Sequence, residues 1–330
     1  MKALVYTGPH EMEVRDVGEP APSADDEVLI KVAACGICGS DMHAWHGHDP
    51  RRVPPLVLGH EAAGEVIGGV GIGRRVTMNP LITCGHCDYC LTGRSNLCEN
   101  RTMIGMTRAG AYAQYVTIPE HCLVDLPDGM EPAQAALTEP TATAWHAVDL
   151  GARAAWRPLA ECNALVIGGG AVGLLTALVL KSRGTRTVRL AETNKLRRET
   201  AAKAGIACFD PADTTPAEQC AQITFDCVGG PKTRELAIHA TQPGGVVVHV
   251  GLQDSSGGID VRKITLAELS FIGVYTYTTA DLRASADALY RGALGDLSWV
   301  EHRPLEDGPA AFRDLDAGRT AAAKIVLLPA

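Results

Sequence analysis

The chain has 330 residues, 46% of them apolar and 21% charged, which excludes a disordered chain and provides material for about two domains. Its formal net charge of −8 argues against a nucleic-acid binder, because such proteins need a basic surface to displace counterions. No apolar signal segment follows the first lysine, and three consecutive glycines break the longest apolar run, residues 164–180. We therefore expect a cytoplasmic protein without a membrane span.

Short strands separated by Gly- and Pro-rich turns are predicted for the first part of the chain. Residues 2–6 and 27–32 have the composition of strands. Short strand signals separated by Gly and Pro continue to about residue 128. Residues 131–150 contain few glycines and many alanines, and Pro132 suits the first turn of a helix. The sequence thus predicts a mostly β region followed by one helix.

Apolar strands then alternate with helices, which indicates a parallel sheet covered on both faces. The sequence contains no internal repeat, so a repeat architecture is not expected. In chain order, the sequence predicts strands at 164–167, 187–191, 223–227 and 245–250 and helices at 171–182, 195–204 and 232–241. The last segment adds helices at about 280–291 and 308–317 and a strand at 324–328.

Cysteine is abundant and unevenly placed. The chain has 11 cysteines, and six of them fall between Cys35 and Cys98. An odd number in a chain of this size, without an export signal, indicates a reducing compartment. There, metal ligation or burial is favoured over disulfides.

The densest cysteine group is Cys84, Cys87, Cys90 and Cys98, with spacings of 3, 3 and 8. Four thiolates this close in sequence can converge on one tetrahedral zinc ion, and Gly85 allows a tight turn. The alternative, four ordinary buried cysteines, is disfavoured because the segment is polar and cannot supply a core. A four-cysteine site leaves no open coordination position, so we expect a structural role.

A second group of metal-binding residue types precedes that segment. Cys35 and Cys38 form a Cys-x-x-Cys pair, Ser40 and His43 follow it, and Gly-His-Glu stands at 59–61. By itself the cysteine pair is typical of a redox site. The next motif gives this group another meaning.

A glycine-rich turn directly follows a predicted apolar strand and opens a predicted helix. In it, Gly168, Gly170 and Gly173 have the spacing of a dinucleotide-binding fingerprint, and Val172 lies among them. The first glycine gives the tight turn, the second lets the backbone approach a pyrophosphate, and the third permits close helix–strand packing. A glycine-rich turn without a ligand is the alternative, but this context favours a cofactor site.

An acidic residue ends the following predicted strand. Glu192 lies 24 positions after Gly168, close to the roughly 20 expected for the acid that binds the ribose hydroxyls of the cofactor. A carboxylate there repels a 2′-phosphate, so the sequence favours NAD over NADP. Arg197 and Arg198 could instead bind such a phosphate, but we interpret them as an exposed helix face.

These motifs, in this order, resemble those of the zinc-dependent medium-chain alcohol dehydrogenases, in their polyol- and threonine-dehydrogenase-like branch. The resemblance covers essentially the whole chain. It rests on Cys38-Gly-Ser40-Asp41-Met-His43, Gly59-His60-Glu61, the four-cysteine segment, Gly110-Ala-Tyr-Ala-Gln-Tyr-Val, Thr138-Glu139-Pro140 and the glycine fingerprint.

The resemblance implies a catalytic zinc in addition to the structural one, and thus two zinc ions per chain. Cys38, rather than Cys35, matches the first ligand, and His60 matches the second. Glu61 and Glu139 match two acidic positions around the metal. Whether Glu61, Glu139 or water is the resting fourth ligand stays open.

The resemblance also implies how the proton and the hydride move. Ser40 matches the hydroxyl that touches the substrate oxygen, and His43 matches the outer end of a proton relay. Zinc would polarise the alcohol, and the nicotinamide would take the hydride. We further expect Trp45 to form a wall of the substrate pocket. Tyr275 and Tyr277 stand where sorbitol dehydrogenases carry an arginine, which argues against sorbitol.

The implied fold class is α/β, with a mostly β, GroES-like catalytic domain and a doubly wound Rossmann domain. We assign residues 1–148 and 276–330, with both zinc sites, to the first domain and residues 149–275 to the NAD-binding second domain. The active site should lie in the cleft between them.

The implied function is hydride transfer between NAD and a secondary alcohol or polyol, a small-molecule substrate, in a homodimer or homotetramer. A threonine- or amino-alcohol-type dehydrogenase would use the same residues. From another class, a catalytically silent, zinc-stabilised binding protein is the alternative, and the intact ligand and relay residues argue against it. A zinc ribbon that binds nucleic acid fits the negative charge least.

Overall fold

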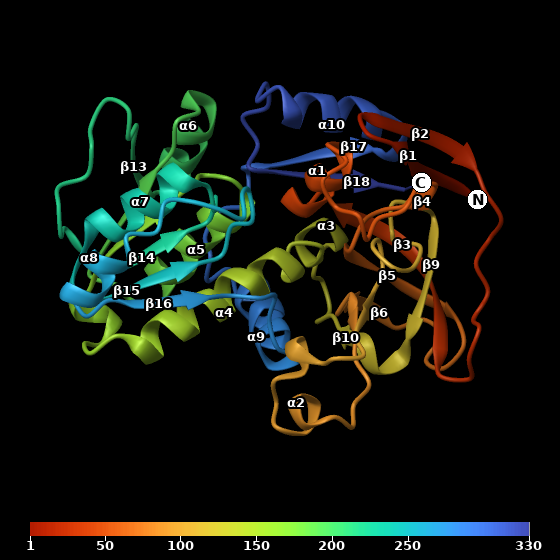
Figure 1. Cartoon of the computed structure of the whole chain (residues 1–330). Coiled ribbons are helices and arrows are strands. Elements are labelled where there is room, and N and C mark those ends of the chain that lie inside the picture. The colour runs from red at the N-terminus through yellow and green to blue at the C-terminus, as the bar shows by residue number, and fades with distance from the viewer. Residues whose placement is uncertain (330) are drawn as a thin grey trace.

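The protein, described by a computed structural model over residues 1–329, has two lobes that are each built around a β-sheet (Figure 1). The first lobe contains a seven-stranded sheet whose strands come from both ends of the chain. The second contains a six-stranded sheet formed by the middle of the chain. Helix α4 (Thr138–Ala154) and helix α9 (Thr279–Tyr290) pack together near the junction of the lobes.

The sheet of the first lobe has the order β10-β6-β5-β3-β18-β17, and β9 also pairs with β3. Strand β18 joins β3 in antiparallel pairing, with Val326 opposite Gly36, so the end of the chain completes a sheet begun near its start. A three-stranded sheet, β2-β1-β4, and the pair β7-β8 lie beside it. The strands are β1 (Lys2–Gly8), β2 (Glu11–Asp16), β3 (Glu27–Gly36), β4 (Leu56–Val57), β5 (Glu61–Gly68), β6 (Arg75–Met78), β7 (Leu81–Ile82), β8 (Thr102–Met103), β9 (Tyr115–Pro119), β10 (Leu123–Asp125), β17 (Val300–Pro304) and β18 (Lys324–Leu328).

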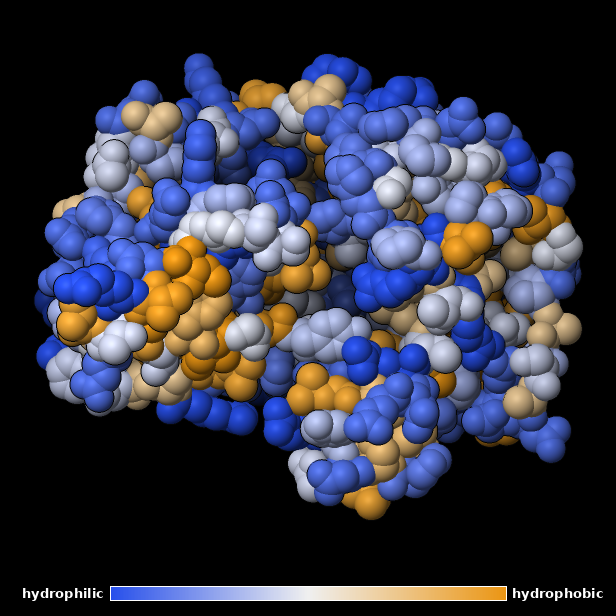
Figure 2. Space-filling view, in the orientation of Figure 1, coloured by the Kyte–Doolittle hydropathy of each residue, from blue (hydrophilic) through white to orange (hydrophobic). Residues whose placement is uncertain are grey.

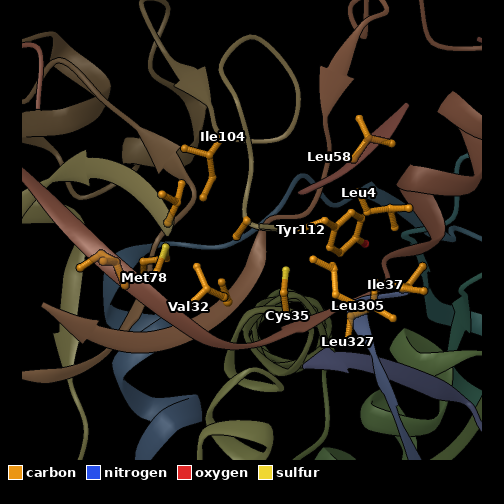
Figure 3. Packing of buried hydrophobic residues seen from close by; sticks show 14 of the residues in the cluster. Leu4, Val32, Cys35, Ile37, Leu58, Met78, Ile104, Tyr112, Leu305 and Leu327 are labelled. Carbon is orange, nitrogen blue, oxygen red and sulfur yellow. The ribbon is translucent and has the colours of Figure 1, made fainter. Parts of the chain in front are cut away.

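The core of the first lobe surrounds strand β3. Val32 and Cys35 of β3 lie in one buried cluster with Leu327 of β18 and with Tyr112 (Figure 3). Cys35 has no exposed surface, which agrees with the prediction that Cys38 is the cysteine available for the site. Dense packing of the buried residues of β3 fixes the backbone that leads into the active-site segment at Cys38.

The sheet of the second lobe is entirely parallel, in the order β13-β12-β11-β14-β15-β16. Ala164 and Val166 of β11 join a core shared with α4 and α5, whereas Leu165 and Ile167 join a core shared with α7. This alternation shows that helices cover both faces, as the predicted doubly wound fold requires. The elements are β11 (Asn163–Ile167), β12 (Thr187–Ala191), β13 (Ala207–Phe209), β14 (Ala221–Asp226), β15 (Thr241–His249), β16 (Ser270–Gly273), α5 (Ala171–Ser182), α6 (Lys195–Lys203), α7 (Pro231–Ala240) and α8 (Val261–Leu266).

The single helix predicted over residues 131–150 is in fact two helices. Helix α3 covers Pro132–Ala135, and α4 begins at Thr138. Pro140 explains the break, because inside a continuous helix its ring would clash with a carbonyl of the preceding turn. As the third residue of α4, it lacks only an N–H that has no partner within the helix. The sequence also gave no signal for the short elements β16, β17 and α8.

The remaining helices are α1 (Gly39–Trp45), α2 (Asp88–Leu91) and α10 (Gly308–Asp316). Within residues 1–329, none of the helices has the length and apolar character needed to cross a membrane. The domain boundaries at 148/149 and 275/276 stay a prediction. Ala330, the last residue of the predicted segment 276–330, lies outside the described residues.

Candidate active site and metal centres

A cleft of about 350 Å³ lies where the two lobes meet, visible as a hollow between them in Figure 2. The first lobe lines it with the start of α1, including Cys38 and Ser40. The second lobe lines it with residues that follow the parallel strands, such as Cys227 after β14 and Val250 after β15. The cleft therefore lies at the carboxyl ends of the parallel strands, where ligands of such sheets bind.

Helix α1 presents the predicted ligand and relay residues to this cleft. Cys38 is its N-cap, and its Sγ accepts a hydrogen bond from the backbone N–H of Ser40 at 3.4 Å. The carboxylate of Asp41 accepts one from the backbone N–H of Cys38 at 3.1 Å, which completes a capping box. Ser40 and His43 are three residues apart on one helix face, and both line the cleft.

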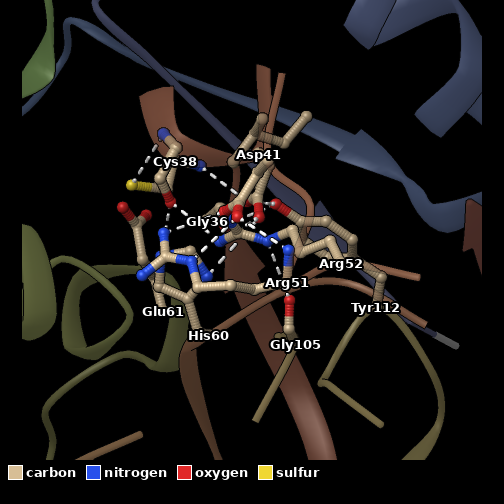
Figure 4. A network of polar contacts seen from close by, with 12 residues as sticks. Gly36, Cys38, Asp41, Arg51, Arg52, His60, Glu61, Gly105 and Tyr112 are labelled. Atoms are coloured by element: carbon tan, nitrogen blue, oxygen red, sulfur yellow. Dashed lines mark hydrogen bonds and ion pairs between the residues drawn. The ribbon is translucent and has the colours of Figure 1, made fainter. Parts of the chain in front are cut away.

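The buried carboxylate of Asp41 also faces His60 (Figure 4). Asp41 accepts a hydrogen bond from the Tyr112 hydroxyl at 2.6 Å, and its Oδ1 lies 3.5 Å from Nδ1 of His60. This Oδ1 also lies 3.6 Å from Nη2 of Arg52, and among residues 1–329 neither Oδ1 of Asp41 nor Nδ1 of His60 has a hydrogen-bond partner. A carboxylate behind one imidazole nitrogen leaves the other for a metal, a common arrangement around ligating histidines.

Glu61 forms a buried ion pair with Lys324. The ammonium group of Lys324 lies 2.6 Å from both carboxylate oxygens and donates another hydrogen bond to the carbonyl of Ile37 at 2.8 Å. Burial alone would lower the pKa of Lys324, but the Glu61 carboxylate outweighs it and the pKa is raised. Gly36 leaves room for this pair, because a Cβ there would lie 2.1 Å from an oxygen of Glu61.

Glu139 reaches the same cleft from α4. Its carboxylate accepts a hydrogen bond of 2.9 Å from the hydroxyl of Tyr277, a residue that is only 2% exposed. Burial raises the pKa of Glu139 to about 8; His60 opposes this rise, and Glu61 reinforces it. A nearby cation would therefore favour the ionised carboxylate.

The donor set suits a catalytic zinc. One donor atom each from Cys38, His60 and Glu61 lie within 4.8 Å of one another, and thiolate, imidazole and carboxylate are the ligands that zinc prefers. Lys324 holds both oxygens of Glu61, whereas Tyr277 holds only one oxygen of Glu139. The structure thus brings Cys38, His60 and Glu61 together, whereas Glu139 lies outside that group, lines the same cleft and is the less tightly held of the two carboxylates.

The hydroxyl of Ser40 lies at the centre of this group. It accepts a hydrogen bond of 3.0 Å from Nη2 of the buried Arg52 and lies 3.5 Å from Nε2 of His60. Burial lowers the pKa of His43, and the positive charge of Arg52 lowers it further. His43 is therefore held in its neutral form, in which it can accept a proton.

The four clustered cysteines form a separate centre around α2, in the loop that projects from the first lobe (Figure 1). The sulfur of Cys84 lies 3.6 Å from that of Cys98 and 4.0 Å from that of Cys90, and Cys87 lies 3.5 Å from Cys90. Tetrahedral zinc with bonds of about 2.3 Å places its sulfurs roughly 3.8 Å apart. The backbone N–H of His86, with that of Cys87, lowers the pKa of Cys84 to about 6, which favours the thiolate. The four residues therefore fit the predicted structural zinc.

The glycine fingerprint has the geometry of a cofactor turn. Gly168 has φ +98°, and a Cβ on Gly173 would lie 1.8 Å from the carbonyl oxygen of Gly168. A Cβ on Gly170 would meet no heavy atom of residues 1–329 within 4 Å, so this backbone faces open space, as approach of a pyrophosphate requires. Val172 lines the cleft beside this turn.

Glu192 lies against the same turn. Its carboxylate accepts hydrogen bonds from the backbone N–H of Gly169 at 2.6 Å and of Asn194 at 2.7 Å. Arg198 is not a free cation, because it donates to Asp210 at 2.7 Å and to two backbone carbonyls. The negative charge at this end of β12 is thus fixed in place.

Comparison with known proteins agrees with this geometry. Residues 24–128 match the alcohol dehydrogenase GroES-like domain, and residues 171–291 match the zinc-binding dehydrogenase family. L-galactonate-5-dehydrogenase of Escherichia coli (strain K12) is 36% identical over 318 residues, which cover 92% of this chain and 91% of that protein. The chain belongs to the zinc-binding alcohol dehydrogenase family. The resemblance inferred from its motifs is confirmed.

Other relatives of this dehydrogenase extend the comparison. L-threonine 3-dehydrogenase of Chelativorans sp. (strain BNC1) is 32% identical, with 97% of both chains covered. A zinc-binding dehydrogenase of Sinorhizobium meliloti 1021, solved with NADP, has a TM-score of 0.88 and 31% identity, and 99% of both chains is covered. Acetophenone reductase of Geotrichum candidum NBRC 4597, solved with NAD, has a TM-score of 0.89 and 28% identity, with 99% of this chain and 96% of that one covered.

One predicted residue of the dehydrogenase does not reach the cleft. Trp45 is 3% exposed and packs in the core against Phe312 and His10, and it is not among the described residues that line the cleft. At the end of α1, its ring packs on His10 of the β1–β2 turn and on Phe312 of α10. The predicted substrate contact of Trp45 is corrected accordingly.

Four functional neighbours were not found from the sequence: Lys324, Tyr277, Arg52 and the role of Asp41 behind His60. Lys324 gave a signal, because it opens the apolar strand predicted at 324–328. The sequence could not identify its partner, which lies 263 positions earlier. Tyr277 was noted only as a departure from the sorbitol dehydrogenase pattern.

Proposed function

We propose that this dehydrogenase transfers a hydride between NAD and a secondary alcohol group of a polyol or hydroxy acid. The observation that carries the proposal is the cleft, which brings Cys38, His60 and Glu139 to the carboxyl ends of the parallel strands and to Val172 of the fingerprint turn. Such a hydride transfer needs residues that can hold a metal ion and a turn that can bind a dinucleotide, and both line this one cleft.

The names of the relatives support this substrate class. They include L-galactonate-5-dehydrogenase, 2-dehydro-3-deoxy-L-galactonate 5-dehydrogenase and L-threonine 3-dehydrogenase. Galactonate and threonine are both carboxylic acids that carry a secondary alcohol. We therefore place hydroxy acids beside neutral polyols as substrates, with a threonine-type amino alcohol as the second candidate.

Bound zinc would polarise the substrate hydroxyl, and bound NAD would accept the hydride. Cys38, His60 and a carboxylate, with Glu139 the freer of the two, would hold the metal. The Oγ of Ser40, which Arg52 holds in position at 3.0 Å, would accept the hydroxyl proton of the substrate as Ser40 gives up its own hydroxyl proton. That second proton would pass to His43, which is neutral and half-buried and would release it to solvent.

A panel of polyols, sugar acids and amino alcohols tests the proposal, with NADH formation followed at 340 nm in protein that contains two zinc ions. We expect turnover with a polyol or a hydroxy acid. Turnover confined to threonine or another amino alcohol would favour the second candidate. No turnover across the panel would overturn the proposal and favour a catalytically silent binding protein.

We also propose that NAD is preferred over NADP. The carboxylate of Glu192, held beside the fingerprint turn, would accept hydrogen bonds from the ribose and repel a 2′-phosphate. The wild-type kcat/KM should be higher with NAD than with NADP, and Glu192→Ala should reduce the difference between these two values. A wild-type preference for NADP would contradict this assignment and direct attention to Arg197, because Arg198 is already paired.

The predicted homodimer or homotetramer also belongs to this proposal. Strand β16 is an edge of the parallel sheet, and large apolar side chains are exposed close to it in the chain; Figure 2 shows apolar surface on this side. Light scattering should give at least twice the 34.8 kDa of one chain. The exposed apolar residues near β16 are Leu252, Ile259, Val261 and Leu266.

The cytoplasmic location rests on the 11 cysteines, all of which lie within the described residues and are free.

A further inference from the structure

A cluster of histidines lies on the first lobe, at the end of α1 opposite Cys38. His10 in the β1–β2 turn, His46 at the C-cap of α1 and Asp316 at the end of α10 offer donor atoms that all lie within 4.8 Å of one another. Nε2 of His46 lies 2.6 Å from Oδ1 of Asp316, and the His10 and His46 rings are 5.4 Å apart. Three segments far apart in sequence thus place two imidazoles and one carboxylate together.

The backbone holds this cluster in place. His10 has φ +60°, a left-handed conformation that few residues other than glycine adopt, and its N–H donates to the carbonyl of Trp45 at 2.7 Å. The turn packs closely on the end of α1, because a Cβ on Gly47 would lie 2.8 Å from the ring of Pro9. The position of His10 relative to His46 is therefore fixed by both elements.

The chemistry of the cluster suits a metal ion more than a simple ion pair. Imidazole with carboxylate is a donor set for Zn²⁺, Ni²⁺ or Cu²⁺. The hydrogen bond from His46 lowers the pKa of Asp316, and the charges of His46 and His10 lower it further, so the carboxylate is ionised. The side chains of His46 and Asp316 are 33% and 38% exposed, which lets water complete the coordination. The ring of His48, 5.7 Å from that of His46, is a further donor nearby.

We propose that His10, His46 and Asp316 form a third metal site, for a divalent transition-metal ion, separate from the two zinc centres. The ion lies between Nε2 of His46 and Oδ1 of Asp316, in place of the hydrogen bond that joins them. It joins the β1–β2 turn, the end of α1 and the end of α10. Since α1 has seven residues and rises about 1.5 Å per residue, the site lies roughly 10 Å from the catalytic ligands.

Titration of the zinc-loaded protein with Ni²⁺ tests the proposal. The chain is used without a polyhistidine tag, which would itself bind Ni²⁺, and calorimetry is combined with metal analysis. We expect one Ni²⁺ bound in addition to two zinc ions, with fluorescence quenching, because the ring of Trp45 lies 5.4 Å from that of His10. His46→Gln and His10→Gln should each weaken Ni²⁺ binding at least about tenfold, since even residues behind a ligand change metal affinity by that amount.

His121→Gln is the matched control, because His121 is an exposed histidine 3.9 Å from Asp26, and among residues 1–329 this pair belongs to no group of three metal donors. It should bind Ni²⁺ as the wild type does. All variants should retain two zinc ions and the wild-type circular dichroism, since the substituted side chains are at least one-third exposed. Equal Ni²⁺ affinity in wild type, His10→Gln and His46→Gln, or binding only at millimolar Ni²⁺, would overturn the proposal.

Discussion

The two cysteine-containing centres of this dehydrogenase are built in opposite ways. The four cysteines around α2 come from one segment of 15 residues, and three of them are partly exposed. The proposed catalytic set draws Cys38 from the N-cap of α1, His60 and Glu61 from the start of β5, and Glu139 from α4. A structural centre can thus be specified by local spacing, whereas a catalytic centre depends on the packing of distant elements.

The surroundings of the two centres differ as well. The α2 centre relies on backbone N–H groups from its own loop, such as that of His86. Around the catalytic set lie buried charges from remote elements, including Lys324 on β18 and Arg52. Such charges orient ligands and leave a coordination position for substrate, which a closed four-cysteine site does not.

Removing one thiol at each centre should separate their roles most strongly. Cys38→Ser should lose one zinc ion and roughly a thousandfold or more in kcat/KM, because several kcal/mol of charge stabilisation disappear. Cys87→Ser should also lose one zinc ion but should chiefly lower the melting temperature, since a structural zinc contributes folding free energy. Zinc analysis, calorimetry and kinetics on both variants check this. One zinc ion in the wild type, with the α2 loop still ordered, would contradict the assignment of two centres.

Ser40→Ala should separate metal binding from proton transfer within the catalytic centre. Loss of the hydroxyl should lower kcat by at least about a hundredfold, the lower range for a positioned acid–base group. The zinc content should remain two per chain, because Ser40 is not a ligand. Near-normal turnover on the true substrate would show that the relay assignment is wrong and would make Glu61 or Glu139 the better candidate for the base.

Tyr277→Phe should show that the catalytic centre depends on a remote element. It removes the hydroxyl that donates to Glu139, so the affinity of this centre for zinc should fall about 10- to 100-fold. Competition with a chelator should therefore release the catalytic zinc earlier than in the wild type, while the α2 centre is unchanged. Tyr275→Phe is the control, because its hydroxyl accepts from Arg101 and not from the metal set. Identical zinc release in both variants would exclude a positioning role for Tyr277.

His43→Gln should have the smallest effect on the maximal rate, because water can partly replace the outer end of the relay. The lowered pKa of His43 keeps the ring neutral until the pH falls below its usual range near 6.5. Wild-type kcat/KM should therefore fall only as His43 becomes protonated below that pH, and His43→Gln should lack this acid limb. An acid limb that persists unchanged in His43→Gln would assign it to another group.

Features that depend on neighbouring residues were predictable from the sequence. The spacing of Cys84, Cys87, Cys90 and Cys98 predicted a set of thiols that the structure brings within 4.8 Å, and the glycine fingerprint predicted the turn between β11 and α5. Helix α5 and strand β18 have the predicted bounds, because their apolar patterns are long and uninterrupted. Pro140 carried the signal for the break between α3 and α4, which the alanine-rich composition obscured.

Features that depend on tertiary packing were decided by the fold. The sequence by itself determined the family and predicted two lobes and the residue types of both proposed metal centres, since these follow from motifs and periodicity. Only the structure placed Lys324 against Glu61, Tyr277 against Glu139 and Trp45 in the core. The contact between Lys324 and Glu61 joins positions 263 residues apart, and no local pattern encodes which buried charge meets which partner.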